Sequence, residues 1–305
     1  MSESVEMRSA GVRFAIIGTG DVGTAFAAAL KQKGVDVALV SGRGGTGARE
    51  RVERLGLPFC DDFEAAVRAA DLVLSAVTGE GSRAVAERVV DLIRADAIFA
   101  DLTSSGPDEI LKAAASFAAR RKTYVDAAIM GAVGLHGQRT PIIAAGPEAS
   151  RFAKIMNGLG FEVSFKAQSR PGDASALKLI RSVFAKGLDM LVIEAMLAAR
   201  AFGLEEDLLE QLGDFDRSTM REIVDMYLRT HPVHAARRLH EMQETEAQLA
   251  SSGLPSFATH AAVERYGRTV ELLERFPPGP EICDDASANL DWMLSAERRS
   301  RIPGS

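Results

Sequence analysis

Three closely spaced glycines near the start of the chain have the spacing of a phosphate-binding turn. Gly18, Gly20 and Gly23 form the pattern G-x-G-x-x-G, directly after the apolar run Val12–Ile17 and directly before an alanine-rich stretch. In such a turn the first glycine allows a tight bend, the second lets the backbone approach a pyrophosphate, and the third lets the helix pack on the sheet. The spacing therefore predicts a dinucleotide site. The expected contacts are Gly18, Thr19, Gly20, Asp21, Val22 and Gly23.

The residues after the next β-branched run indicate which dinucleotide binds. NAD-binding domains usually place an Asp or Glu at this point, where it accepts a hydrogen bond from the ribose 2′-hydroxyl. This chain has Ser41 and Arg43 there, and a hydroxyl beside a guanidinium suits a 2′-phosphate. We therefore expect NADP in preference to NAD, with a solvated loop arginine as the alternative interpretation of Arg43. Val77 and Thr78, at the end of the third expected strand, are assigned to the same cofactor site.

One lysine lies in surroundings that can adapt it to proton transfer. Lys178 occupies the first turns of a long apolar stretch, Ser175–Ala201. Desolvation lowers the pKa of a lysine, and the charge of Arg181, one helical turn further along, would lower it again. Such a lysine can act as a general acid or base near neutral pH. A lysine that only extends its ammonium group to water is the alternative.

The first half of the chain alternates β-branched runs with helix-length stretches. Strands are expected at Val12–Ile17, Asp36–Val40, Leu72–Ala76, Ala97–Ala100, Thr123–Ala127, Ile142–Ala145 and Glu162–Phe165. Helices are expected at Gly23–Lys33, Gly47–Leu55, Ser82–Arg94 and Asp108–Arg120. Such alternation predicts βαβ units in an α/β Rossmann domain with a doubly wound, mostly parallel sheet. We expect this NADP-binding domain to span residues 12–170.

From Ala174 onward the sequence contains only helical stretches. After Ser175–Ala201, helices are expected at Glu205–Leu212, Arg217–Leu228, Pro232–Leu249 and Thr259–Arg275. They predict an all-α C-terminal domain over residues 171–305, for substrate binding and dimerisation. Because Ser175–Ala201 is unusually apolar, we expect it to be buried against its own domain or against a second copy in a homodimer. The tail after Pro277 is rich in proline, glycine and charge, and no helix is assigned to it.

The composition argues against several kinds of partner. The 305 residues carry a net charge of −6, which gives no reason to expect a nucleic acid or an anionic membrane. No apolar run approaches the roughly 20 residues that span a bilayer, and the N-terminus lacks the apolar segment of a signal peptide. Cys60 and Cys283 match no metal or redox spacing. His231, His234 and His240 lack acidic partners at ligand spacing. We expect no metal and a reducing, cytoplasmic location.

Four motifs, taken together, point to a known family. They are the turn Gly18–Gly23, the D-x-T-S-S-x-P stretch Asp101–Pro107, the stretch Asp126–Gly131 (DAAIMG), and Gly172 followed by Lys178, Glu194 and Ala195. With them the chain resembles the β-hydroxyacid dehydrogenase family, which includes 3-hydroxyisobutyrate and 6-phosphogluconate dehydrogenases. A weaker match places His240-Glu241-Met242 before Gly253-Leu254-Pro255, at the spacing of the family's K-D-L segment. The resemblance runs from the first strand to the helix after Pro255.

The resemblance implies roles for residues on both sides of the reaction. Lys178 would be the catalytic acid or base, next to the nicotinamide. Thr103, Ser104 and Ser105 would lie by the nicotinamide and the substrate carboxylate, where an open α/β sheet binds its ligand. The same serines can also cap the following helix. The substrate-side positions are Thr103, Ser104, Ser105, Met130, Gly131, Arg181, Ser182 and His240.

Several of these positions depart from the family's pattern. Arg181 and Ser182 stand where the family usually has two asparagines. Met130 replaces a serine that holds the substrate carboxylate, and His240 occupies the lysine position of the K-D-L segment. Because the cofactor side is intact, the departures indicate a different substrate and not an inactive enzyme. Arg181 is either a surface arginine or a new bidentate partner for a carboxylate or phosphate.

The sequence therefore predicts an NADP-dependent oxidoreductase. It would transfer hydride between the nicotinamide and a small hydroxy acid or related carbonyl compound, with Lys178 moving the proton. Two alternatives stay open. The I-M-G stretch also resembles imine reductases, which generally lack the lysine found here at Lys178. The chain could instead bind NADP(H) without catalysis, with Lys178 serving only the structure.

Overall fold

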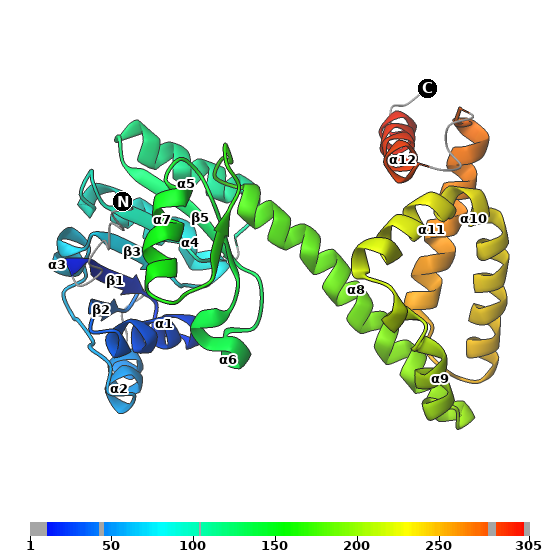
Figure 1. Ribbon diagram of the computed structural model, residues 1–305, viewed down its shortest axis with the longest axis horizontal. Coiled ribbons are helices and arrows are strands. Elements are labelled where there is room, and N and C mark those ends of the chain that lie inside the picture. Colours follow the sequence, from blue (N-terminus) through cyan, green and yellow to red (C-terminus); the bar gives the residue numbers. More distant parts are fainter. Residues whose placement is uncertain (1–10, 43–45, 104, 280–284, 302–305) are drawn as a thin grey trace, which may run out of the picture. The chain divides into compact units, whose positions relative to one another are not determined.

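The chain divides into two compact units, one up to Ser182 and the other from Val183. A computed structural model describes residues 11–42, 46–103, 105–279 and 285–301 (Figure 1). The division falls inside a long helix, whereas the sequence places the domain boundary before that helix, at residues 170 and 171. That functional boundary stays a prediction, and the two units are described separately.

In the described part of the first unit, seven strands form one sheet in the order β2-β1-β3-β4-β5-β6-β7. They are β1 (Arg13–Ile17), β2 (Asp36–Val40), β3 (Leu72–Ser75), β4 (Ile98–Asp101), β5 (Thr123–Ile129), β6 (Ile142–Ala145) and β7 (Val163–Phe165). Each corresponds to a predicted strand, with bounds that differ by two residues at most. Neighbouring strands are parallel except β5 and β6, which are antiparallel. The predicted α/β class with a mostly parallel sheet is confirmed.

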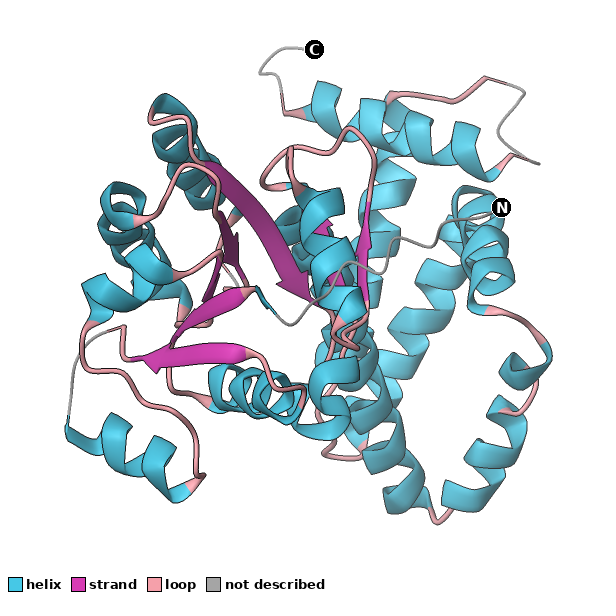
Figure 2. Ribbon diagram, turned by 60° about the vertical axis from the view of Figure 1, so that its left-hand side comes forward, coloured by secondary structure: helices cyan, strands magenta, loops and turns pink. Residues whose placement is uncertain are grey.

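Helices cover both faces of this sheet (Figure 2). They are α1 (Asp21–Gln32), α2 (Thr46–Arg54), α3 (Phe63–Ala69), α4 (Gly79–Leu92), α5 (Pro107–Ala119), α6 (Val133–His136) and α7 (Ala149–Gly158). Phe26 of α1 and Phe152 of α7 belong to the core on one face. Val67 of α3, Val89 of α4 and Phe117 of α5 belong to the core on the other. Because both faces are buried, the strands are continuous apolar runs, which is why the sequence reveals them so clearly.

The order of the strands determines where a ligand can enter. β1 has β2 on one side and β3 on the other, so the direction of winding changes between β1 and β3. Ile17 at the end of β1 is the register partner of Ser75 at the end of β3. In an open α/β sheet, the carboxyl ends of the two strands at such a point border the ligand crevice. The glycine turn follows β1 at this edge.

The second unit is helical. Helix α8 (Asp173–Phe202) begins in the first unit and ends in the second. The others are α9 (Glu205–Leu212), α10 (Met220–Ser251), α11 (Phe257–Arg275) and α12 (Ala286–Ser300). Two expectations were wrong here. Arg217–Leu228 and Pro232–Leu249 are not separate helices but parts of α10, and the tail to which no helix was assigned contains α12.

A buried asparagine explains how α10 continues through a proline. Pro232 has no N–H, so the carbonyl of Leu228, four residues earlier, loses its partner within the helix. The Nδ2 of Asn289, in α12, donates to the Leu228 oxygen at 2.9 Å and to the Arg229 oxygen at 3.0 Å. The side chain that replaces the lost bond lies about sixty residues along the chain, which is why a local pattern could not reveal it.

A buried glutamate ties α8 to another helix of the second unit. Glu194 accepts hydrogen bonds from the backbone N–H of Ala258 and Thr259, both at 2.8 Å, and from the Thr259 hydroxyl at 2.7 Å. Burial alone would raise the pKa of Glu194, but these hydrogen bonds lower it below its usual value. Glu194 therefore caps the first turn of α11 as a carboxylate.

Two further findings concern the residues that the structure describes. None of their helices combines the length and the apolar character needed to cross a membrane. None of their His, Cys, Asp and Glu side chains form a group of three or more that could hold a metal ion. The cytoplasmic location and the absence of a metal stay predictions.

Candidate active site

The glycine turn between β1 and α1 is held by backbone contacts that exclude larger residues. Gly18 donates its N–H to the carbonyl of Val40 at 3.0 Å, and its φ is +125°. A Cβ on Gly18 would lie 2.3 Å from the carbonyl oxygen of Ala76, and one on Gly23 would lie 1.9 Å from that of Gly18. The turn is thus pressed against β3 on one side and against α1 on the other, as the predicted roles of these glycines require.

The start of α1 offers a place for a phosphate. Gly20 is the N-cap of the helix and forms no side-chain cap. A Cβ on Gly20 would meet nothing within 4 Å, so the space in front of the turn is open. The first N–H groups of a helix have no partners inside it, and they carry the positive end of the helix dipole. The residues therefore fit a dinucleotide pyrophosphate, the group that the fold implies.

The end of β2, where the cofactor is selected, is only partly described. Ser41 follows Val40 directly and is half-buried. Arg43 lies outside the described residues. Thr78 is exposed and is the N-cap of α4, while Val77 precedes it at the end of β3. Ser41 and Val77 thus lie at the ends of β2 and β3, the strands on either side of β1, and the arrangement leaves the choice between NADP and NAD to be tested.

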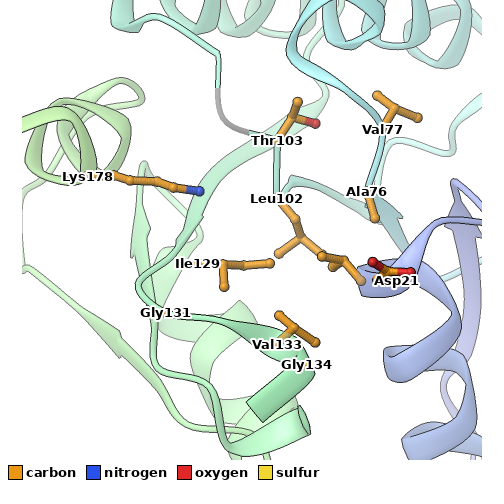
Figure 3. Close-up of a pocket in the computed structure, with 11 residues that line it drawn as sticks. Asp21, Ala76, Val77, Leu102, Thr103, Ile129, Gly131, Val133, Gly134 and Lys178 are labelled. Carbon is orange, nitrogen blue, oxygen red and sulfur yellow. The ribbon is translucent and has the colours of Figure 1, made fainter. Parts of the chain in front are cut away.

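A cavity of about 310 Å³ opens beside the turn (Figure 3). Its walls come from the turn and α1, the ends of β3, β4 and β5, α6 and the start of α8. They are Asp21, Val22, Ala76, Val77, Leu102, Thr103, Ile129, Gly131, Val133, Gly134 and Lys178. Six predicted site residues therefore share one cavity, three from the cofactor side (Asp21, Val22, Val77) and three from the reaction side (Thr103, Gly131, Lys178). A pocket of this size suits part of a ligand such as a nicotinamide ring with a small substrate.

Thr103, which lines this cavity, has a buried hydroxyl without a hydrogen-bond partner among the described residues. Its side chain is 3 % exposed. A buried hydroxyl without a partner is costly, and a bound ligand is one way of satisfying it. Ser105, further along the same loop, donates to the carbonyl of Gly79 at 3.4 Å. Ser104 lies outside the described residues.

The loop that carries Thr103 is fixed by a buried carboxylate. Asp101, at the end of β4, accepts hydrogen bonds from the Thr103 N–H at 2.9 Å, the Ser82 hydroxyl at 2.6 Å and the Tyr124 hydroxyl at 2.9 Å. Burial and the charge of Asp101 raise the pKa of Tyr124, so its hydroxyl stays a donor. The sequence motif included Asp101, but its role depends on partners from α4 and β5.

Lys178 extends from α8 toward the cavity, with Leu102 and Thr103 across from it (Figure 3). Burial lowers the pKa of its ammonium group, and the charge of Asp126 partly opposes that effect. Asp126 lies at the same register position of β5 as Asp101 does in β4, and both carboxylates are fully buried. A half-buried lysine beside a carboxylate is an arrangement suited to proton transfer.

Five predicted substrate residues do not line this cavity, and Ser105 is one of them. The Met130 side chain packs with Ala128 of β5, Ala145 of β6 and Ala174 at the start of α8. Arg181 is exposed and Ser182 is half-buried, both on α8. His240 belongs to α10 in the second unit, where its exposed ring lies 3.5 Å from the Glu244 carboxylate. Their roles toward the substrate stay predictions.

Two family models match the chain, one within each of its two compact units. Residues 13–161 match the NAD binding domain of 6-phosphogluconate dehydrogenase. Residues 199–269 match a domain of unknown function (DUF1932). The first model covers β1 to β6, the glycine turn and the Thr103 loop, and the second covers α9, α10 and part of α11.

Several known proteins resemble the chain over most of its length. One is a conserved protein of unknown function whose solved structure revealed similarity with 3-hydroxyacid dehydrogenases. It is 31 % identical, and the match covers 85 % of this chain and 97 % of that chain with a TM-score of 0.59. An uncharacterized 28.5 kDa protein of Methanothermus fervidus is 26 % identical over 246 residues, 80 % of this chain and 93 % of the relative. The chain belongs to the β-hydroxyacid dehydrogenase family.

The same fold occurs in an imine reductase. A variant of the Myxococcus stipitatus enzyme, solved in complex with NAD+, has a TM-score of 0.73 and covers 92 % of this chain and 99 % of its own. At 18 % identity this likeness concerns the fold alone. The chain thus has the architecture of a nicotinamide-dependent dehydrogenase or reductase.

The glycine turn gives a direct test of the cofactor site. Gly18→Ala would place a methyl group against the carbonyl of Ala76 and force a side chain into a left-handed φ. We expect it to weaken NADPH binding about tenfold, because the turn would shift away from the binding conformation and restoring that conformation costs of order 1–2 kcal/mol. Fluorescence titration of bound NADPH measures the effect.

A second glycine provides the matched control. Gly47 lies in α2, and a Cβ there would meet nothing within 4 Å. Gly47→Ala is expected to leave NADPH affinity unchanged and to stabilise the helix by about 0.5–1 kcal/mol. Equal NADPH affinity in the two variants would contradict the assignment of the glycine turn to the cofactor site.

Proposed function

We propose that this chain is an NADP-dependent oxidoreductase that transfers hydride between a nicotinamide and a small hydroxy acid or related carbonyl compound. One observation carries the proposal: Lys178 and Thr103 lie in the same cavity as Asp21 and Val22 of the dinucleotide turn. Lys178, the proposed proton-transfer group, therefore lies in the cavity that adjoins the proposed cofactor site. This is the arrangement that hydride transfer with proton transfer needs.

The reaction divides the work between the cofactor and the protein. When bound, the nicotinamide supplies or takes up the hydride at carbon. In oxidation, the neutral Lys178 amine takes the proton of the substrate hydroxyl while hydride leaves the carbon that bears this hydroxyl. In reduction, the Lys178 ammonium returns a proton to the carbonyl oxygen. The Thr103 hydroxyl, which has no partner among the described residues, is available to orient that oxygen.

Replacement of Lys178 tests the proton-transfer role. Lys178→Met is expected to lower kcat by roughly 10²–10⁴-fold, the usual contribution of a positioned acid or base. NADPH oxidation would be followed by absorbance with panels of keto acids, aldehydes and cyclic imines, and NADP+ reduction with hydroxy acids. Lys178→Arg is the matched control, since it keeps a positive charge but does not exchange its proton in this pH range. Full turnover in either variant on the best substrate would contradict the proposal.

The pH profile of the same reaction tests the state of the lysine. Reduction requires the protonated amine, so its rate is expected to fall as pH rises through the pKa of Lys178. Because burial lowers that pKa below the ordinary 10.5, the fall begins at a lower pH than a solvated lysine would give. A reduction rate that stays constant up to the ordinary value would contradict this assignment.

The preference for NADP rests on the residues after β2. Ser41 ends that strand without a carboxylate, and the sequence places Arg43 two residues later. Arg43→Ala is expected to raise KM for NADPH roughly tenfold or more, because a charge-assisted bond to the 2′-phosphate is lost. KM for NADH would change little. An enzyme that prefers NADH, with no response to Arg43→Ala, would overturn the NADP assignment.

Imine reduction is a second candidate, supported by the lining of the cavity. Lys178 is the only basic side chain among the described residues that line it, and most of the other walls are apolar. A substrate without a carboxylate would suit such walls. The substrate panel separates the two reactions, because faster turnover of cyclic imines than of keto acids would favour the second. Tight NADPH binding without turnover of any compound would favour a non-catalytic role.

We also propose that the chain forms a homodimer through α8. Large apolar side chains on this helix are exposed in the isolated chain, among them Ile180 (63 %), Val183 (72 %) and Ile193 (56 %). Exposed apolar patches of this extent are usually covered by a protein partner, and a second copy is the partner always present. Sedimentation equilibrium is expected to give twice the chain mass of 32.6 kDa. A species of 32.6 kDa at micromolar concentration would contradict the homodimer.

A further inference from the structure

A buried carboxylate on β5 binds the first turn of the helix that carries Lys178. The Oδ2 of Asp126 accepts hydrogen bonds from the N–H of Gly172 at 2.9 Å and of Ser175 at 3.0 Å. Its Oδ1 accepts one from the Ser175 hydroxyl at 2.7 Å. Asp126 and the residues it binds are separated by more than 45 positions in the sequence. The contact therefore joins the sheet to α8 and is not a local turn.

The bonds favour the ionised form of Asp126 and orient α8. All three partners donate, so both oxygens of the carboxyl group must accept, which a carboxylate does best. Burial and the charge of Asp101 raise the pKa of Asp126, and the hydrogen bonds from Ser175 and Gly172 reduce that rise without reversing it. A carboxylate at the first turn also faces the positive end of the helix dipole. Asp126 thus acts as a cap for α8, supplied by the sheet.

The cap lies one helical turn from the proposed proton-transfer group. Ser175 and Lys178 are three residues apart in α8, so their side chains are neighbours on one side of the helix. A shift of the first turn would move Lys178 with it. We propose that Asp126 is a positioning residue, which holds Lys178 over the cavity by fixing the first turn of α8 and by placing a negative charge near its ammonium group. This role rests on the proposed function of Lys178.

The charged residues of the elements around Lys178 come from β5, α1 and α8, and of these the charge of Asp126 acts on its pKa. Asp126 comes from β5, and Asp21, from α1, lines the same cavity. Asp173 and Arg181 lie on α8 itself, and Asp173 pairs with Arg170 at the surface. Burial destabilises the ammonium form of Lys178 and the charge of Asp126 stabilises it. Loss of the Asp126 charge would therefore lower the pKa of Lys178, whereas loss of the exposed Asp173 charge is screened by water.

Three variants separate position from charge. Asp126→Asn keeps the size of the side chain but removes its charge and one acceptor. Ser175→Ala keeps the charge and removes one hydrogen bond. Asp173→Asn, the matched control, removes a charge from the same first turn without touching Asp126. Each would be made in the full chain, and its thermal unfolding midpoint would identify the variants that fold.

The primary readout does not need a substrate. The rate at which acetic anhydride acetylates Lys178, measured by mass spectrometry across a range of pH, gives the titration of its amine. In Asp126→Asn we expect this titration to move to lower pH, and in Asp173→Asn to stay at the wild-type position. An unchanged titration in folded Asp126→Asn would overturn the proposal. If Asp126→Asn does not fold, the Ser175→Ala variant provides the test. A wild-type kcat in Ser175→Ala would overturn the proposal as well.

Turnover provides the second readout. On the best substrate of the panel, Asp126→Asn is expected to lower kcat by roughly 10–100-fold, since small misplacements of a reacting group cost about this much. KM for NADPH would stay within about twofold, because Asp126 is not part of the glycine turn. If the wild-type protein turned over nothing while the titration still shifted, the proposed function would fail and the link between Asp126 and Lys178 would stand.

Discussion

The carboxylate of Asp126 binds the first turn of α8 to the sheet, and the position of Lys178 depends on that contact. Burying a carboxylate is unfavourable unless each oxygen is hydrogen-bonded, and here three donor groups of Gly172 and Ser175, at the start of α8, satisfy it. Glu194 forms a similar contact at the first turn of α11 in the second unit. In both cases a carboxylate from one element caps the helix of another. The long apolar helix α8 thus takes part in both contacts, once as the capped helix and once as the source of the cap.

The polar residues of the site are confined to one edge of an otherwise apolar sheet. Ser75 at the end of β3 is the register partner of Asp101 at the end of β4, and Asp101 is the register partner of Asp126 in the middle of β5. Residues before them in the strands are buried among apolar side chains, so a buried carboxylate is tolerated only where helices and loops supply donors. Asp101 fixes the Thr103 loop and Asp126 fixes α8. The two carboxylates therefore support the two sides of the cavity on which the proposed reaction depends.

The parts of the fold that the sequence predicts correctly are those determined by local patterns. The buried strands appear as apolar runs, and the role of Gly18 follows from its place directly after β1. The continuity of α10 could not be predicted, because the partner for the Leu228 carbonyl comes from Asn289 in α12. Helix α12 was not predicted either, because the tail after Pro277 is rich in proline, glycine and charged residues. In each case the decisive contact joins residues far apart in sequence.

The same distinction applies to the site. Lys178 and Thr103 could be selected from motifs, and the structure brings both into one cavity with the turn. The functions of Asp101 and Asp126 could not be predicted, because their motifs do not indicate which hydroxyl and N–H groups donate hydrogen bonds to them. A signal was present, since each is an acidic residue that follows an apolar run directly. An unexplained carboxylate in a buried strand indicates a partner from elsewhere in the chain.

The proposed reaction requires Lys178 to lie beside the nicotinamide of the bound cofactor. Acetylation of Lys178 in the presence of saturating NADP+ or of 2′-phospho-ADP-ribose, which lacks the nicotinamide, tests it without knowledge of the substrate. We expect NADP+ to slow the acetylation of Lys178 strongly and 2′-phospho-ADP-ribose to slow it far less. Equal rates with the two ligands, both shown to be bound, would contradict it.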